Sequence, residues 1–146
     1  MKNLKNHLLL LLTVIGIIAI VASCKKSSSN NTSITKENIA GSYKLTGVSV
    51  TVPPFPAQDV TDSIPACQRD DIVKLNVDLS MVYTDAGTKC APPGDFNSTW
   101  SLSGNNISID TLSGVIQKFD GKVLIINSDI NFNGISGTST ETFTKQ

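Results

Sequence analysis

The sequence contains a single histidine, His7, and it lies within the first ten residues. The rest of the chain therefore lacks an imidazole, the side chain that most often acts as a general base near neutral pH and as a zinc ligand. A Ser-His-Asp triad is excluded for the same reason. The sequence thus predicts a protein that is not an enzyme and that holds no metal and no cofactor.

Arginine is equally scarce, since Arg69 is the only one. The lysines form no basic stripe, so we expect no nucleic acid as a partner. If residues 1–23 are removed, Lys2 and Lys5 leave with them, and ten basic side chains face twelve acidic ones. The remaining chain is long enough for one domain with a single core.

The chain begins with a short basic segment that contains Lys2 and Lys5, followed by the uncharged run Leu8–Val21. This order is typical of a secretory signal peptide. About 14 residues at ~1.5 Å each give a helix of about 21 Å, shorter than the ~30 Å hydrocarbon core of a bilayer. A membrane-spanning helix is therefore the less favoured alternative.

The run closes with Val21-Ala22-Ser23-Cys24, which resembles the lipobox of bacterial lipoproteins, with Val21 in place of the commoner leucine. In that family the cysteine is acylated and becomes the N-terminus after cleavage. The resemblance implies that residues 1–23 are a signal peptide and that Cys24 anchors the protein to a membrane, because several acyl chains together bind stably. Secretion without a lipid is the alternative.

Residues 24–38 are rich in serine and asparagine after Lys25 and Lys26, so they cannot bury apolar area. We predict a flexible tether. By the sorting pattern of lipoproteins, a lysine directly after the cysteine implies export to the outer membrane. The tether has no acidic run of the kind that directs some lipoproteins to the cell surface, which favours the periplasmic face.

Residues 39–146 are predicted to be all-β, because no long window repeats apolar residues at helical spacing and turn signals recur every eight to twelve residues. Thr35 is a candidate cap of one short helical turn before the first strand. Asp120-Gly121 and Asn133-Gly134 are hairpin signals. About eight locally connected strands predict a small antiparallel up-and-down β-barrel, since closure removes the sheet edges.

Two local features of the strands lead to specific predictions. The apolar positions change phase at Gly47, which predicts a β-bulge. A turn at Asp78-Leu79-Ser80 would pair Val77 with Met81 and Leu75 with Tyr83.

Extending that hairpin outward brings Cys67 nearly opposite Cys90. These two cysteines are also the even pair that remains once Cys24 is an anchor in an oxidising compartment. We therefore predict a disulfide, which contributes about 3 kcal/mol by closing its loop. Two buried free thiols are the alternative.

Several motifs together resemble the lipocalin-like domain of small Gram-negative lipoproteins. They are Gly41-Ser42-Tyr43, Cys67-x-x-Asp70-Asp71, the hairpin at 78–80, Cys90, and Ser98-Thr99-Trp100-Ser101-Leu102. The resemblance covers Ile39–Gln146 and implies an eight-stranded barrel with a non-enzymatic binding function. We expect a small apolar ligand or an envelope protein as the partner, and the sequence names neither.

The candidate ligand-binding residues face the interior of this barrel. They are Tyr43, Leu45, Leu75, Tyr83 and Trp100. The alternative is a filled core, because eight strands leave room for side chains or for one small ligand. The protein would then be a structural or protein-interaction lipoprotein that makes contact through the loops Pro53–Ala66 and Cys90–Asn97.

The triplets Asp62-Ser63-Ile64 and Asp110-Thr111-Leu112 resemble acceptors for O-glycosylation in exported bacterial proteins, which makes Ser63 and Thr111 candidates. Chance occurrence in a chain rich in serine and threonine is the alternative. The aspartates at 59, 62, 70 and 71 lack EF-hand spacing, so we interpret them as solvated acids rather than as calcium ligands. A carboxylate pair for glycoside hydrolysis is not favoured in so small a domain.

Overall fold

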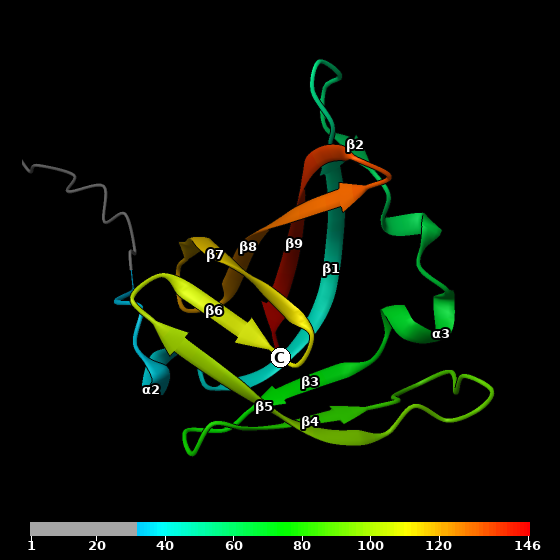
Figure 1. Ribbon diagram of the computed structural model, residues 1–146. Helices are drawn as coiled ribbons and strands as arrows, with labels where there is room; N and C mark the ends of the chain where they lie inside the picture. The colour runs from blue at the N-terminus through cyan, green and yellow to red at the C-terminus, as the bar shows by residue number, and fades with distance from the viewer. Residues whose placement is uncertain (1–31) are drawn as a thin grey trace, which may run out of the picture.

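The computed structural model describes residues 32–146 (Figure 1). The predicted signal peptide and Cys24 lie outside these residues. The first element is α2 (Lys36–Ile39), a single turn in which the Thr35 hydroxyl accepts a hydrogen bond from the Asn38 amide at 3.3 Å. The predicted cap is therefore confirmed. Among the described residues, no helix is long and apolar enough to cross a membrane.

Eight antiparallel strands form a closed ring. Each strand of the ring pairs with the next along the chain, and β1 pairs with β9 to complete the closure. A ninth strand, β2 (Gln58–Asp59), adds two residues beside β1. The ring strands are β1 (Gly41–Thr51), β3 (Ile72–Leu75), β4 (Ser80–Thr84), β5 (Phe96–Ser103), β6 (Asn106–Ile109), β7 (Leu112–Phe119), β8 (Val123–Phe132) and β9 (Ile135–Lys145). The predicted all-β barrel of about eight strands is confirmed.

The hairpin turns follow the glycine and asparagine signals closely. Asn133 and Gly134 join β8 to β9 with φ angles of 52° and 84°, the left-handed pair that a tight hairpin requires. The β7–β8 turn lies one residue later than predicted. There the Asp120 amide donates to the Val123 carbonyl at 3.3 Å, which leaves Gly121 and Lys122 at the tip.

The bulge in β1 is also confirmed, because the register against β9 shifts between Leu45 and Gly47. The extra residue bends β1, so that its first half pairs with β3 and its second half pairs with β2. This bend separates β1 from β3 at one end of the ring.

The predicted register of the β3–β4 hairpin is wrong by two residues. Leu75 pairs with Met81, and Val73 pairs with Tyr83. The turn is wider than expected because the Asp78 carboxylate accepts a hydrogen bond from the Ser80 amide at 3.0 Å, with the residue between them at a φ of 70°. A shift of two residues keeps every strand side chain on its predicted face.

The core fills the α2 end of the ring. Tyr43 and Trp100 are both at most 2% exposed, and each has a partner for its polar atom. The Tyr43 hydroxyl donates to the Ile39 carbonyl at 2.5 Å, and the Trp100 indole N–H donates to the Asn76 carbonyl at 2.8 Å. Burial raises the pKa of Tyr43 from 10.0 to about 12. These bonds allow large polar aromatics to serve as core residues.

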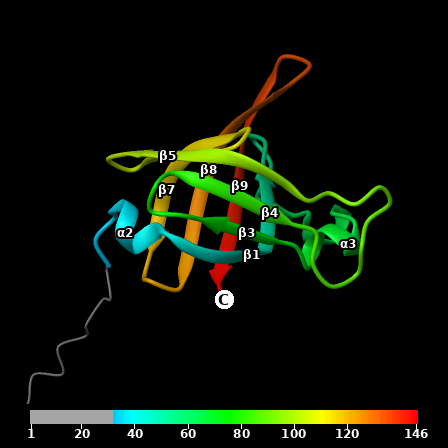
Figure 2. The ribbon, with the colours of Figure 1, turned by 90° about the horizontal axis from the view of Figure 1, so that it is seen from below.

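The two ends of the ring differ. The short helices α2 and α3 (Ala66–Arg69) lie at opposite ends of β3 and β4 in both views (Figures 1 and 2). The segment between β1 and β3 contains β2, a 3₁₀ turn η2 (Thr61–Ser63) and α3. We use the name lid segment for Val60–Arg69, which lies at the end of the ring where β1 and β3 separate.

Candidate functional site

A half-open pocket of about 290 Å³ lies at the α3 end of the barrel. Its walls are mainly apolar and come from strands, from the lid segment and from the β6–β7 turn. The lining residues are Leu45, Ile64, Gln68, Asp71, Val73, Met81, Tyr83, Phe96, Ile109, Asp110, Thr111, Leu112 and Phe143. A volume near the lower end of the usual range for ligand sites suits one small molecule.

The five residues predicted to bind a ligand divide between the pocket and the core. Leu45 and Tyr83 line the pocket. Tyr43, Leu75 and Trp100 are buried at the opposite end, where they fill the barrel and do not line the pocket. The sequence pattern identified all five as inward-facing, but position along the barrel decides which of them a ligand can reach.

One wall of the pocket is a stacked aromatic pair. The rings of Tyr83 and Phe96 lie 4.9 Å apart at an interplanar angle of 19°. The Tyr83 hydroxyl donates a hydrogen bond to the Asp71 carboxylate. Burial, together with this bond, raises the pKa of Tyr83, so the hydroxyl stays protonated at neutral pH. The pair is therefore a fixed, partly polar wall.

Asp71 is the buried acid of the pocket, at 5% exposure. Besides the Tyr83 hydroxyl, its carboxylate accepts the Ala86 amide at 2.9 Å. A second acid, Asp110, sits at the exposed β6–β7 turn and accepts the Ser98 hydroxyl at 2.6 Å. Among the described residues that line the pocket there is no lysine, arginine or histidine.

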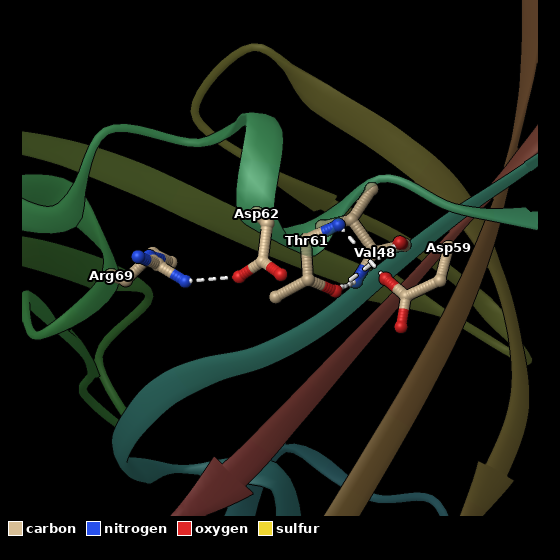
Figure 3. A network of polar contacts seen from close by, with 5 residues as sticks. All are labelled: Val48, Asp59, Thr61, Asp62 and Arg69. Carbon is tan, nitrogen blue, oxygen red and sulfur yellow. Dashed lines mark hydrogen bonds and ion pairs between the residues drawn. The ribbon is translucent and has the colours of Figure 1, made fainter.

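The lid segment is attached to β1 by a threonine. The Thr61 hydroxyl accepts a hydrogen bond from the Val48 amide at 2.8 Å and lies 3.3 Å from the Val48 carbonyl (Figure 3). The Thr61 amide donates to Asp59 at 2.9 Å, and bonds from the Thr61 side chain and backbone lower the pKa of Asp59. Arg69 then joins α3 to η2 through Asp62 at 2.6 Å (Figure 3). The single arginine thus forms an ion pair on the surface, since the Asp62 side chain is 98% exposed.

The disulfide between Cys67 and Cys90 is present, with an S–S distance of 2.02 Å, and the prediction is confirmed. It connects α3 to the loop between β4 and β5. The predicted outward extension of the hairpin to the two cysteines is therefore wrong, because β3 begins at Ile72 and β4 ends at Thr84. Asp85, which is fully buried, organises the same loop because its carboxylate accepts the amides of Cys90 at 3.2 Å and Gly94 at 3.1 Å. The Asp70 carboxylate accepts a hydrogen bond from the Thr88 amide of the same loop at 2.8 Å.

The sequence reasoning missed Asp85 and the pocket roles of Phe96, Asp71 and Asp110. An acid directly after an apolar strand gives no sign of whether it is solvated or binds backbone amides. The motif Cys67-x-x-Asp70-Asp71 is the nearest signal in the sequence, since it places two acids beside a disulfide.

The remaining predicted positions lie on the surface. Ser63 is exposed in η2, and Thr111 is exposed at the β6–β7 turn, where it also lines the pocket. Within residues 32–146, no group of three or more histidine, cysteine, aspartate or glutamate side chains is placed to hold a metal ion.

A larger groove of about 600 Å³ lies on strands β5 to β9, away from this pocket. Small polar side chains such as Ser101, Asn106 and Gln117 form most of its lining. Among the described residues of this lining, Asp129 is the one charged side chain. The lining of the groove is about as polar as it is apolar, whereas the pocket at the α3 end is mainly apolar, so that pocket is the better candidate site for a small apolar ligand.

Comparison of the chain with known proteins identifies a family, but it identifies no individual relative. Residues 34–145 match the model of the lipocalin-like domain. No curated protein and no solved structure matches the chain. Proteins of this family are generally non-enzymatic and of a binding type. Because the match spans most of the chain, and the barrel agrees with it, this protein belongs to the lipocalin-like domain family.

Proposed function

We propose that this chain is a lipid-anchored protein of the outer membrane whose lipocalin-like domain holds a small, largely apolar molecule and catalyses no reaction. The observation that carries the proposal is the apolar pocket of about 290 Å³ above a filled core. A barrel that is closed at one end and half-open at the other holds a ligand without letting it pass through.

Support for the anchor comes from the sequence, where Cys24 follows a signal-like segment, and the periplasmic face remains our proposal for its address. The described residues begin at the α2 end, and α3 lies at the other end of β3 and β4 (Figure 2). The pocket is at the α3 end, because Gln68 of α3 is part of its lining. An anchor attached upstream of α2 would thus leave the pocket accessible.

The binding proposal is tested with a soluble form that starts at Lys25, because the ring, the core and the pocket all lie within residues 32–146. The neutral fluorophore N-phenyl-1-naphthylamine serves as the probe. We expect a saturable rise in fluorescence with the unmodified protein. Val73 is part of the pocket wall, so Val73→Trp fills the pocket and should abolish the rise in fluorescence. Val115→Trp is on the outer face of the barrel and should preserve that rise.

Thermal melting of both tryptophan variants shows whether each is folded. Equal fluorescence from Val73→Trp and Val115→Trp, with both variants folded, would place the fluorophore outside the pocket and contradict the proposal.

The anchor is tested on the natural full chain expressed in a Gram-negative host. Intact mass should show loss of residues 1–23, a gain of acyl chains at Cys24 and a loss of two protons from the disulfide. Cys24→Ala should abolish acylation and prevent this processing. A mature protein with a bare thiol at Cys24 would contradict the proposed address.

A second candidate function is protein interaction, which exposed apolar side chains favour. Phe132 and Ile135 at the β8–β9 turn are 75% and 57% exposed, and Phe55 is 67% exposed. The β8–β9 hairpin extends beyond the rest of the barrel (Figures 1 and 2). Chemical crosslinking in intact cells separates the two candidates. A crosslink lost in Phe132→Ser/Ile135→Ser and kept in Val73→Trp would favour interaction.

A further inference from the structure

We propose that the pocket selects a small amphiphile with a primary ammonium head group and rejects the corresponding carboxylate. This inference rests on the proposed function and specifies the chemistry of its ligand. It combines three observations on the described residues: the apolar floor, the two acids and the absence of basic residues in the lining.

The depth of each lining residue sets the orientation of such a ligand. Met81, Ile109 and Phe143 are at most 7% exposed and form the floor next to the filled core. Gln68 and Asp110 are exposed, and they mark the mouth. An alkyl chain is therefore placed against these apolar side chains. Its head group lies beside the carboxylates of Asp71, which is 5% exposed, and of Asp110 at the mouth.

The polar side chains of the pocket are suited to a donor. The Asp71 carboxylate accepts one hydrogen bond on each oxygen, from Ala86 and from Tyr83. A carboxylate has about four lone-pair sites, so both oxygens can accept again. Asp110 offers a second carboxylate at the mouth. An ammonium group carries three donors, which carboxylate oxygens can accept.

Two basic side chains of α3 and of the loop between β4 and β5 have partners of their own. Arg69 is paired with Asp62 at 2.6 Å, and the Lys89 ammonium donates to the Asp85 carbonyl. A ligand carboxylate in the pocket would therefore meet the Asp71 carboxylate, and no cation among the described lining residues would offset the repulsion.

The net charge of the whole domain also favours a cationic ligand over an anionic one. Residues 32–146 contain eight basic and twelve acidic side chains, a net charge of −4. A field of this sign concentrates cations near the surface and repels anions, although salt screens its long-range part.

The test compares three probes that differ only in the head group: octylammonium, octan-1-ol and octanoate. Isothermal titration at pH 7 with the soluble form should give the tightest binding for octylammonium, about tenfold weaker binding for octan-1-ol, and no measurable binding for octanoate. Asp110→Asn and Asp71→Asn should each reduce the preference for octylammonium over octan-1-ol several-fold.

Asp129→Asn is the matched control, because it removes the same charge from the outer groove. We expect it to leave the preference unchanged. Asp110 is exposed, so its variant stays informative even if Asp71→Asn fails to fold.

The outcomes separate this inference from the proposed function. Binding of octan-1-ol as tight as that of octylammonium, or binding of octanoate, would overturn the ammonium preference and leave the binding function standing. An equal loss of preference in Asp129→Asn would assign the effect to net charge and overturn the role of the pocket acids. Failure of all three probes to bind would contradict the proposed function and this inference together.

Discussion

Single residues in this barrel show why an inward-facing aromatic is not enough to identify a ligand site. Tyr43 and Trp100 face inward as the alternating pattern predicts, yet each donates its polar hydrogen to a backbone carbonyl and fills the core. Tyr83 faces the same interior, but its hydroxyl meets Asp71 at the pocket. The sequence predicts which face of the sheet each side chain is on. Whether an empty volume remains next to that side chain depends on how residues far apart in the chain pack together.

Tyr43→Phe tests the core assignment and its pH dependence. Loss of the bond to the Ile39 carbonyl should lower the free energy of unfolding by about 1 kcal/mol at pH 7. The folded protein keeps the Tyr43 proton up to a pKa of about 12, whereas the unfolded chain releases it near 10.0. The stabilisation from the hydroxyl is therefore complete below pH 10 and falls as the pH rises toward 12.

Urea unfolding of the unmodified protein and of the variant at pH 8, 10 and 11.5 measures this difference. A difference that stays constant across the three pH values would contradict the buried hydroxyl.

The secondary-structure elements were predictable where the determinant is local. The β8–β9 turn and the bulge at Gly47 depend on the conformations of neighbouring residues, and both were found as predicted. The predicted register of the β3–β4 hairpin was wrong, because the hydrogen bond from the Ser80 amide to the Asp78 carboxylate widens the turn. Most of the lid segment falls in the predicted loop Pro53–Ala66. Its order could not be predicted, because it comes from contacts such as Thr61 with Val48, which are distant in sequence.

The disulfide should stabilise the lid end of the barrel more than the ring itself. The double variant Cys67→Ser/Cys90→Ser removes the disulfide, which closes a loop between two residues 23 positions apart. Its loss should lower the free energy of unfolding by about 3 kcal/mol. The backbone amides of residues 66–69 and 86–94 should also exchange with deuterium faster. Amides of β8 and β9 should keep their relative protection, because their pairing does not involve the disulfide.

Urea unfolding and hydrogen exchange by mass spectrometry provide these two measurements. A uniform loss of protection over the whole ring would contradict a local role for the disulfide.

On the scale of the whole molecule, the fold class and the family could be anticipated from the strands and their motifs, and residues 34–145 match the lipocalin-like domain. The position of the pocket could not be anticipated, because it depends on the filled α2 end, on the bend in β1 and on the lid segment together. The resulting barrel has one closed end and one half-open end. Our account of its function depends on that asymmetry.

The most direct test of this account observes Met81, which lies on the pocket floor and is the only methionine after Met1. A methyl-¹³C-methionine label in the soluble form gives one internal resonance, and Met81→Leu assigns it. During titration with octylammonium, the account predicts a saturable shift of this resonance in the unmodified protein and in Val115→Trp, and none in folded Val73→Trp. A resonance that stays still while octylammonium binds elsewhere, or that shifts equally in Val73→Trp, would contradict it.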